Sequence, residues 1–599
     1  MTVRIKRAAE AKGYKNDKEA VAADSLWEAA YLKEIEKLER KGELKVIQKQ
    51  ENMKPLPFIE VLTQKEDNIS GDIIRKVRLA ARGDLQVKKP DNCYSPTAGA
   101  TEILLFLVHA VKSRSFIMQG DCPSAYLNGR LEDPIHLYLP QGHPKNDGKN
   151  TFIYECPASI YGLAVAGRVW YLKFVEIITE FGFKSSIRSP TMFHLKKEGC
   201  VMHLIIYVDD FLVSSNSREL IEEAKDYLFK KLQVKCTEDV TKFVGLQVEK
   251  AENHNIYLHQ TDMILKLANQ YRIEEGVDTP MVYNLKWNNN SEPLEQKRKL
   301  QKIFGELNFI AGLSRPDIAY PINKIARRLQ DPTKEVFRAA KRVLSYLLST
   351  FDLAMKISID KRPTWSLKAY SDASFADIAE EKYKSTGGYT ILLDDSVISW
   401  KTKKLRFICT SSSEAEYLAT FSAAKEALYI GFLLKEVFFI DTFPITLYCD
   451  NKAVCDILNQ KGVKELTKYM CTKVFKLNEW VEEGLIVIKQ IRSKDNVADI
   501  FTKINSQFTC LRKRLLQPRG SVVDSIEGKA TVPGITRGST AVDESRNKKV
   551  ALNIKDEKKD TVVNSIIKEA EEKEHNRVDR GEDNIFIQCS LAETIDKQS

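Results

Sequence analysis

The stretch Ile205–Val213, IIYVDDFLV, sets two adjacent aspartates, Asp209 and Asp210, inside an apolar run that favours β-structure. Successive side chains of a strand point to opposite faces, so a central strand of this sequence would bury at least one carboxylate. A buried charge is costly unless it is paired or binds a metal. We therefore expect the aspartates at the tip of a hairpin, where a divalent cation would offset their repulsion. The alternative is a plain acidic turn, and these letters alone do not exclude it.

The composition is that of a folded chain with several domains. Its 599 residues are enough for three or four domains, and 43% of them are hydrophobic. The net charge of +10 suits a polyanionic partner but does not demand one. The eleven cysteines are scattered singly, which favours a reducing compartment over disulfides or structural zinc. No secretory signal and no apolar run of about 18 residues is found, so we expect no membrane span.

Hydrophobic periodicity divides the chain into five regions. Residues 1–45 are expected to form a helical extension ending near Gly42, with Leu26, Ala29, Ala30 and Ile35 on its apolar stripe. We expect an α+β multidomain protein, with an α+β domain at 46–280, a helical region at 281–365, and an α/β domain at 366–504. Residues 505–599 are predicted to be a charged, disordered tail, because 511–599 contain a single aromatic residue, Phe586.

A third acid and an aromatic residue accompany the aspartate pair. Asp121 ends the strand-like run SFIMQGD, and Tyr126 follows five residues later. A polymerase needs carboxylates from separate strands to hold two Mg²⁺ ions, one at the primer 3′-hydroxyl and one at the incoming triphosphate. Asp121, Asp209 and Asp210 could supply them.

The order of several sequence blocks resembles the reverse transcriptase of copia-type (Pseudoviridae) LTR-retrotransposon Pol polyproteins. The blocks are KVRLAARGD (76–84), GDCPSAYLNGRLEDPIHLYLPQG (120–142), SIYGLAVAGRVWY (159–171), IIYVDD (205–210) and FVGLQVE (243–249). A further block, LNFIAGLSRPDIAYPIN (307–323), looks like the segment that follows the polymerase in that family. The resemblance implies a right-hand polymerase with fingers and palm at 46–280 and a thumb or connection at 281–365.

The resemblance also implies roles for individual residues. Asp121, Asp209 and Asp210 would bind metal on the palm, and Tyr126 would exclude a 2′-hydroxyl by stacking under the sugar. Lys76 and Arg78 resemble the basic fingers residues that meet the triphosphate. Tyr126 could instead be a core aromatic residue, and the two basic residues could belong to a solvated strand.

One segment departs from the family pattern. The usual Tyr-Gly-Leu-Lys-Gln block is Tyr161-Gly162-Leu163-Ala164-Val165 in this chain, so a lysine and a glutamine are replaced at Ala164 and Val165. In the family this segment lies beside nucleotide and template, so the change bears on catalytic competence.

Four more acids stand at the ends of predicted elements after residue 366. Each also fits a purely structural role: Ser413-x-x-Glu416 as a capping box, Asp450 as a helix N-cap, Asp499 as a first-turn acid and Asp372 as a turn residue. Their order along strands and helices is nevertheless the order of the acids with which ribonuclease H binds two Mg²⁺ ions.

Sequence around these acids resembles the copia-type ribonuclease H. The matching blocks are YKSTGGYT (383–390), VISWKTKK (397–404), SSSEAEYLA (411–419) and NVADIFTK (496–503). The resemblance implies a metal site of Asp372, Glu416, Asp450 and Asp499, with Glu414 a weaker candidate than Glu416. The family's Thr-Lys-His-Ile block is Thr467-Lys468-Tyr469-Met470 in this chain, which loses a histidine.

These observations predict an RNA-directed DNA polymerase with ribonuclease H activity and two Mg²⁺ ions per active site. The resemblance implies as partners an RNA template, a DNA primer, an RNA–DNA hybrid and deoxynucleoside triphosphates, without a membrane. It also implies a cytoplasmic virus-like particle with access to the nucleus. Protease, integrase and zinc-cluster motifs are not found, so we expect a polymerase–ribonuclease H remnant with structural proteins supplied in trans. Two alternatives are a degenerate remnant that binds nucleic acid without turnover, and a chain in which only the ribonuclease H half is active.

Overall fold

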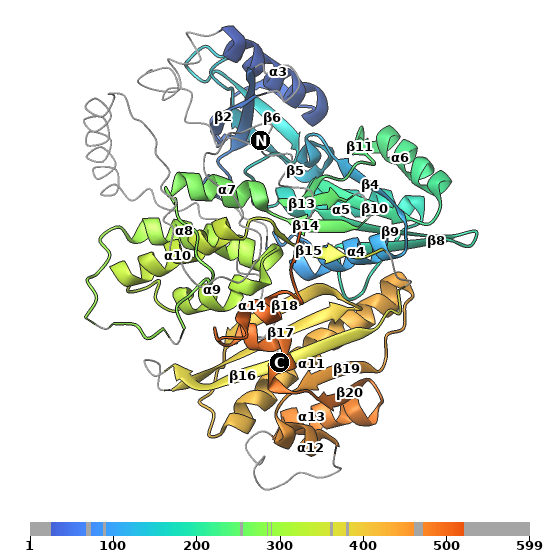
Figure 1. Ribbon diagram of the computed structural model, residues 1–599. Coiled ribbons are helices and arrows are strands. Elements are labelled where there is room, and N and C mark those ends of the chain that lie inside the picture. Colours follow the sequence, from blue (N-terminus) through green and yellow to red (C-terminus); the bar gives the residue numbers. More distant parts are fainter. Residues whose placement is uncertain are drawn as a thin grey trace. The chain divides into compact units, whose positions relative to one another are not determined.

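The structure is a computed structural model that describes residues 25–66, 73–87, 91–251, 255–283, 285–288, 290–359, 363–378, 383–459 and 471–519 (Figure 1). Predictions for residues 1–24, for the segment around Tyr469 and for the tail beyond 519 lie outside these residues. None of the helices in the described ranges is long and apolar enough to cross a membrane.

The first helix packs on two small antiparallel sheets. Its bounds and those of the strands are α3 (Ser25–Gly42), β1 (Lys45–Gln48), β2 (Phe58–Glu66), β3 (Ile73–Ala81), β5 (Arg130–Tyr138) and β6 (Phe152–Ala158). Strands β2 and β3 form a hairpin, and β1, β6 and β5 form the second sheet. The helix ends at Gly42 as predicted, but its buried stripe is Trp27, Tyr31, Ile35 and Leu38. Of the predicted stripe, Ile35 is buried and Ala30 is half-buried against the same core, whereas Ala29 is exposed because the larger Trp27 and Tyr31 fill this face.

A six-stranded antiparallel sheet carries the aspartate pair. Its order is β11 (Lys235–Thr237), β4 (Phe116–Asp121), β10 (Asp210–Ser215), β9 (Cys200–Tyr207), β8 (Met192–Lys197) and β7 (Lys184–Ser185). Helix α4 (Ala100–Lys112) covers one face, where it packs with Ile205 and Leu212. Helices α5 (Ala166–Phe181) and α6 (Arg218–Leu232) pack on the other face with Ile206 and Phe211. The strands read as continuous apolar runs because both faces are covered.

A second antiparallel sheet joins distant parts of the chain. Its order is β12 (Lys242–Phe243), β13 (Leu246–Lys250), β14 (Ile256–His259), β15 (Leu353–Ile357) and β21 (Gln517–Pro518). The helices between β14 and β15 are α7 (Thr261–Gln270), α8 (Lys297–Leu313), η3 (Pro316–Ile318), α9 (Ala319–Ala326) and α10 (Lys334–Ser349). Residues 505–519, which we expected to belong to a disordered tail, are folded: they contain α14 (Phe508–Arg512) and β21, which pairs with β15.

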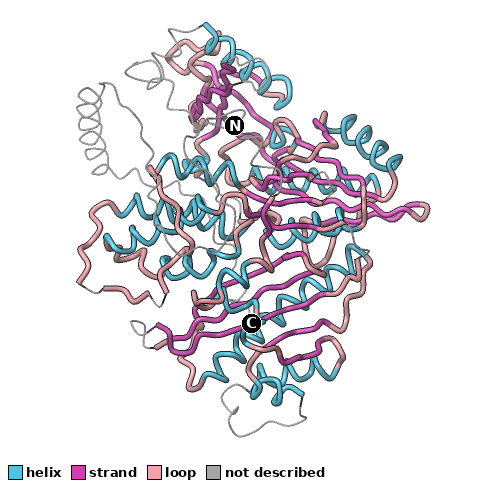
Figure 2. Tube along the Cα trace, viewed as in Figure 1, coloured by secondary structure: helices cyan, strands magenta, loops and turns pink. Residues whose placement is uncertain are grey.

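A five-stranded mixed sheet with helices follows residue 366 (Figure 2). Its order is β18 (Ser396–Lys404), β17 (Lys384–Leu393), β16 (Leu367–Ile378), β19 (Ile445–Cys449) and β20 (Ile486–Gln490). Strands β19 and β20 run parallel to β16, and the other pairings are antiparallel. The accompanying helices are α11 (Ser412–Leu433), the π-helical turn η5 (Leu434–Phe438), α12 (Lys452–Asn459), α13 (Cys471–Glu482) and η8 (Val497–Phe501).

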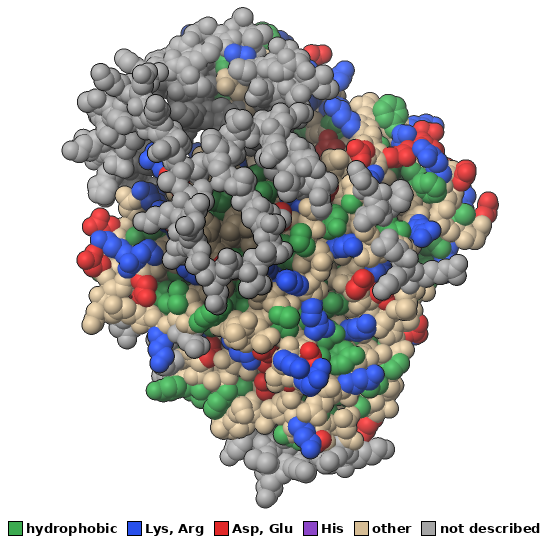
Figure 3. Space-filling model, in the orientation of Figure 1, with side chains coloured by type: hydrophobic (Ala, Val, Ile, Leu, Met, Phe, Trp, Pro, Cys, Tyr) green, Lys and Arg blue, Asp and Glu red, His purple; other side chains and the backbone are tan. Residues whose placement is uncertain are grey.

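One face of the described surface is mixed in charge. Figure 3 shows lysine and arginine side chains among acidic and apolar ones on that face. A preference of that face for a polyanion would have to come from local clusters of basic residues rather than from a uniformly basic surface.

Two candidate acidic sites

The aspartate pair lies at a hairpin tip, as predicted. Tyr207 of β9 pairs with Asp210 of β10, so Val208 and Asp209 make the two-residue turn. Val208 has a φ of 58°, which a β-branched residue rarely adopts. The indole N–H of Trp170 donates to the Val208 carbonyl oxygen at 2.6 Å, and the Cys122 N–H donates to the Asp209 carbonyl oxygen at 3.0 Å. Neighbouring elements thus hold the strained turn in place.

Asp121 lies directly across from Asp210, because β4 and β10 pair in the register Asp121–Asp210. Burial, together with the charges of Asp209 and Asp121, raises the pKa of Asp210 to about 6. Burial and Asp209 also raise the pKa of Asp121, against the opposing effect of nearby basic residues. The hard carboxylate oxygens gathered there are the ligands that Mg²⁺ prefers. Among the described residues, however, Asp121, Asp209 and Asp210 do not form a group whose carboxylate oxygens all lie within 4.8 Å of one another.

A cleft of about 930 Å³ opens beside Asp121 and Asp209. Lys76 and Arg78, both singled out from the sequence, line it. Six basic residues that the sequence analysis missed line it too: Lys33, Lys37, Arg40, Lys41, Arg75 and Lys235. The four on α3 have the i, i+4, i+7, i+8 spacing of one helix face, a signal that could have revealed them. Glu34 and Glu36 line the cleft as well, and Glu34 pairs with Lys37. The cleft thus combines an excess of basic residues with the aspartates, an arrangement that suits a phosphate ester with bound cations.

Tyr126 lies between the core and the cleft. It is half-buried, and its ring centroid is 4.7 Å from that of Tyr161, which lines the cleft. Burial and the charge of Asp209 raise the pKa of Tyr126. The Arg78 guanidinium lies 5.6 Å from the Tyr161 ring. Tyr126 is thus part of the packed interior and also close to the acids.

The segment that departs from the family pattern is tied to β3. The Ala81 N–H donates to the Tyr161 carbonyl oxygen at 2.7 Å, and Gly162 has a φ of 93°. Ala164 is exposed, while Val165 is half-buried beside the core just before α5. The two replacements therefore change the surface of this loop more than its backbone anchor.

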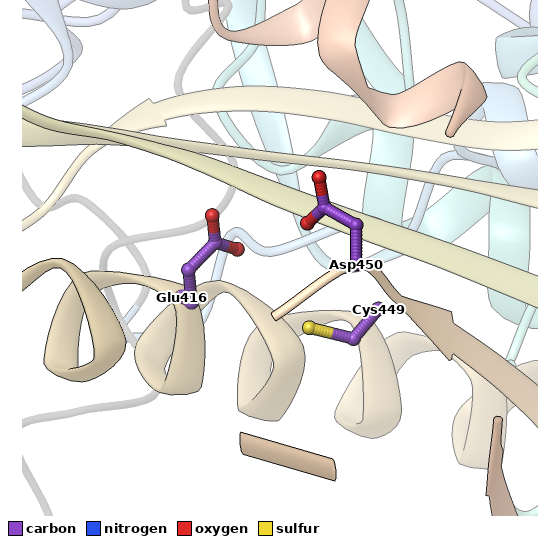
Figure 4. Close-up of side chains that lie close together, drawn as sticks. All are labelled: Glu416, Cys449 and Asp450. Atoms are coloured by element: carbon purple, nitrogen blue, oxygen red, sulfur yellow. The ribbon is translucent and has the colours of Figure 1, made fainter. Parts of the chain in front are cut away.

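The four later acids converge at a second site, from four separate elements. Asp372, Asp450 and Asp499 place carboxylate oxygens within 4.8 Å of one another. Glu416, Cys449 and Asp450 form a second such group (Figure 4). Asp450 is shared, so the acids of β16, α11, η8 and the end of β19 make one cluster.

Three of the four local structural roles considered for these acids are not observed, whereas Asp499 does lie in the first turn of η8, as its structural alternative required. Helix α11 is capped by Ser411, whose hydroxyl accepts from the Glu414 N–H at 3.2 Å, so the capping box excludes Glu416. Asn451, not Asp450, caps α12 by accepting from the Val454 N–H at 3.1 Å. Asp372 lies within β16 rather than in a turn. Glu416, Asp450 and Asp372 are therefore not explained by capping or turn formation.

The second site is more buried than the first. Burial and the charge of Asp372 raise the pKa of Glu416 to about 10 and that of Asp499 to about 7. The Lys503 ammonium, which the sequence analysis missed, lies 3.5 Å from Asp372 and 3.2 Å from Asp499. Glu416 Oε2 and Asp499 Oδ1 are buried and accept no hydrogen bond from any residue in the described ranges. Such orphaned oxygens fit a divalent cation, which would supply the missing positive charge.

Comparison with known proteins gives a consistent result. Residues 42–283 match a family described as reverse transcriptase (RNA-dependent DNA polymerase). The Retrovirus-related Pol polyprotein from transposon RE1 of Arabidopsis thaliana is 30% identical over 445 residues, which cover 73% of this chain and 30% of that protein. A transposon Ty5-1 protein of Saccharomyces cerevisiae is 30% identical over 310 residues, 51% of this chain and 99% of that one.

The chain thus spans about 30% of the length of the first of these relatives. Among solved structures, a foamy viral protease–reverse transcriptase in complex with double-stranded DNA matches with a TM-score of 0.44 and 13% identity. That match covers 78% of this chain and 69% of the viral one. At this level of similarity, the fold description rests on the strand order and register given above.

Proposed function

Since this chain belongs to the Pol proteins of copia-type LTR retrotransposons, we propose that it is an RNA-directed DNA polymerase with ribonuclease H activity. The observation that carries the proposal is the convergence of separated acids at two sites. Asp121 faces Asp210 on two adjacent strands, and Asp372, Asp450 and Asp499 meet at the five-stranded mixed sheet.

At the first site, Asp121, Asp209 and Asp210 would hold two Mg²⁺ ions, which would activate the primer 3′-hydroxyl and neutralise the triphosphate. Lys76 and Arg78, which line the same cleft, would bind the phosphates of the deoxynucleotide. In this proposal the six-stranded sheet belongs to the palm and the β2–β3 hairpin to the fingers, with α3 as the helical extension that precedes them. The helices from α8 to α10 would be the thumb or connection.

Tyr126 would lie under the sugar and select against a 2′-hydroxyl. Its ring packs edge-on against Tyr161, which lines the cleft, and this supports the role because a half-buried ring is held firmly next to the cleft.

At the second site, Asp372, Glu416, Asp450 and Asp499 would hold two Mg²⁺ ions, which would activate water and stabilise the leaving 3′-oxygen. Lys503 partly neutralises the cluster from one side. The partners would be an RNA template, a DNA primer and their hybrid. The chain would act in cytoplasmic virus-like particles with access to the nucleus, with structural proteins supplied in trans.

A second candidate function is nucleic-acid binding without turnover. The replacements at Ala164 and Val165 favour it, because they remove two polar side chains next to the first site. Both candidates predict salt-sensitive binding of nucleic acid, so binding does not separate them.

The test measures Mg²⁺-dependent extension of a DNA primer on an RNA template, beside cleavage of an RNA–DNA hybrid. We expect Asp209→Asn to lower extension at least about a hundredfold while sparing cleavage, and Asp450→Asn to do the reverse. Asp278→Asn, at an exposed residue outside both sites, is the matched control. A folded wild-type chain that binds the hybrid but performs neither reaction would favour the non-catalytic function. Cleavage without extension would leave only the ribonuclease H half active.

A further inference from the structure

A buried thiol lies beside the second acidic site. Cys449 ends β19 and is fully buried, with its Sγ within 4.8 Å of a carboxylate oxygen of Glu416 and of one of Asp450. Figure 4 shows the two carboxylates turned to the same side, with the thiol next to the helix that carries Glu416. Mg²⁺ takes hard oxygen ligands, whereas thiolate sulfur selects softer metals such as Zn²⁺. The group of Glu416, Cys449 and Asp450 thus favours a softer metal than the group of Asp372, Asp450 and Asp499, whose ligands are all carboxylates.

The Glu416 carboxylate points independently to a ligand at this position. The residue is only 8% exposed, and its Oε2 accepts no hydrogen bond among the residues described. A buried carboxylate oxygen without a donor is unfavourable, and a cation is the partner that would satisfy it. The ligand atoms of Glu416, Cys449 and Asp450 all lie within 4.8 Å of one another, so small side-chain rotations would bring all three onto one ion.

We propose that Glu416, Cys449 and Asp450 form a binding site for a thiophilic divalent cation of the Zn²⁺ and Cd²⁺ class. Two oxygens and one sulfur leave a fourth position of a tetrahedral site to water. On binding, the Cys449 S–H bond breaks, the sulfur–metal bond forms, and the proton passes to solvent. No oxidation or reduction takes place.

Cys455 provides a matched control. It lies on α12, and its thiol donates to the Cys449 carbonyl oxygen at 3.7 Å. It is therefore a buried thiol next to the proposed ligand, but it is not a member of the three-residue group. The two thiols also interact through their side chains, so replacing Cys455 removes a sulfur that contacts the proposed ligand. Loss of the Cd²⁺ signal in a folded Cys455→Ser chain would assign the metal to a Cys449–Cys455 pair and overturn the three-residue site.

Zn²⁺ bound at this site should inhibit cleavage of an RNA–DNA hybrid, an expectation that rests on the proposed function. An ion held by Glu416 and Asp450 would occupy two of the four acids that hybrid cleavage would need. Zn²⁺ should therefore inhibit cleavage by competing with Mg²⁺, and it should do so more weakly in a chain without the Cys449 sulfur.

The experiment titrates the metal-free full chain with Cd²⁺ and follows the ultraviolet thiolate-to-cadmium charge-transfer band, without nucleic acid. Other cysteines contribute background, so the signal is the difference between variants. We expect Cys449→Ser to lose one equivalent of the band and Cys455→Ser to keep it. Mutation of a residue that only hydrogen-bonds a metal ligand already lowers metal affinity about 10- to 100-fold. Glu416→Gln changes a proposed ligand itself, so it should lower the affinity of this site for Cd²⁺ at least about tenfold.

Unchanged Cd²⁺ binding in a folded Cys449→Ser chain would overturn the proposal. Circular dichroism checks folding, and Glu416→Gln tests the same site if the serine variant fails to fold. Because the band is read without catalysis, an inactive chain still tests the metal site. An active chain whose Zn²⁺ inhibition is the same in wild type and Cys449→Ser would also count against it.

Discussion

Gly162 is held where almost no other residue fits. Its φ of 93° lies in the left-handed region, and a Cβ there would lie 2.0 Å from the Ala81 carbonyl oxygen. That oxygen belongs to the backbone of β3 and cannot move aside as a side chain can. Gly148 has a similar φ of 71°, but a Cβ there would meet nothing within 4 Å.

We therefore predict very different effects for alanine at these two glycines. Gly148→Ala should lower the free energy of unfolding by about 1–2 kcal/mol, the strain of a left-handed residue. Gly162→Ala adds a backbone collision and should lower it by more than about 4 kcal/mol. Urea unfolding of the two variants and the wild type measures the difference, and equal losses would contradict the collision.

Two histidines are buried where the six-stranded sheet and α4 meet the end of α11. The rings of His109 and His203 lie 4.9 Å apart, and Phe438 of η5 packs 4.3 Å from the first and 4.8 Å from the second. Burial and the neighbouring His194 lower the pKa of His203 to about 3, and burial lowers that of His109 well below its usual range.

These shifts predict a loss of stability in acid. In the unfolded chain a histidine takes up a proton below about pH 6.5, whereas folded His203 stays neutral until about pH 3. Acidification through this window favours the unfolded state, by about 2 kcal/mol for one such histidine at pH 5. Between pH 7 and pH 5, His203→Leu should lose about 2 kcal/mol less than the wild type in urea unfolding. An identical loss would show that His203 does not titrate as its burial implies.

At the scale of elements, the last described segment returns to the first half of the chain. Strand β21 pairs with β15, and Arg519 follows it with only 5% of its surface exposed. The Arg519 guanidinium donates to Glu249 of β13 at 2.6 Å and to Thr261 of α7 at 2.9 Å. The segment that carries the second site is thus inserted, along the chain, between β15 and β21, which pair with each other in one sheet.

Arg519→Ala should therefore destabilise the sheet that contains β13 and β14. Removal of a buried cation leaves Glu249 and Thr261 without their donor, and the expected loss is about 3 kcal/mol. Lys513→Ala, an exposed change in the same segment, should stay within about 0.5 kcal/mol. Chemical denaturation followed by tryptophan fluorescence compares them, and similar losses would mean that β21 is not anchored by Arg519.

At the scale of the whole described chain, one hydrophobic core serves both halves. The largest cluster of buried residues includes side chains of α4, α8 and α10 together with those of β16, β17 and α11. Polar contacts reinforce it: Lys112 pairs with Asp395 at 2.8 Å, and the Trp400 indole donates to the Ala311 carbonyl oxygen at 2.8 Å. Part of the apolar surface of each half is therefore buried against the other half.

We predict that the regions carrying the two sites unfold together. Calorimetry of the full chain should show one main transition, and a fragment of residues 363–519 should melt at a lower temperature because it lacks α8 and α9. Two well-separated transitions, or a fragment as stable as the full chain, would contradict a shared core.

The hairpin at Asp209 and Asp210 was predictable because paired acids in an apolar run have few low-energy placements. The four later acids could be chosen because their order along the chain is that of ribonuclease H and the blocks around them resemble a known family. The roles of all seven acids stay predictions, whereas their convergence at two sites is observed. The family itself was also correctly identified from ordered blocks of sequence.

What only the tertiary structure decided are contacts between residues far apart in sequence. The local sequence pattern does not predict that Lys503 lies close to both Asp372 and Asp499. Nor does it predict that Ser411 rather than Ser413 caps α11, or that the Cys449 sulfur lies near the Glu416 carboxylate. Residues after 505 were expected to be a disordered tail because they are charged. Arg519 is nevertheless buried, and it pairs with Glu249, which lies far earlier in the sequence. Sequence determines which side chains need a partner, and packing decides which partner each one finds.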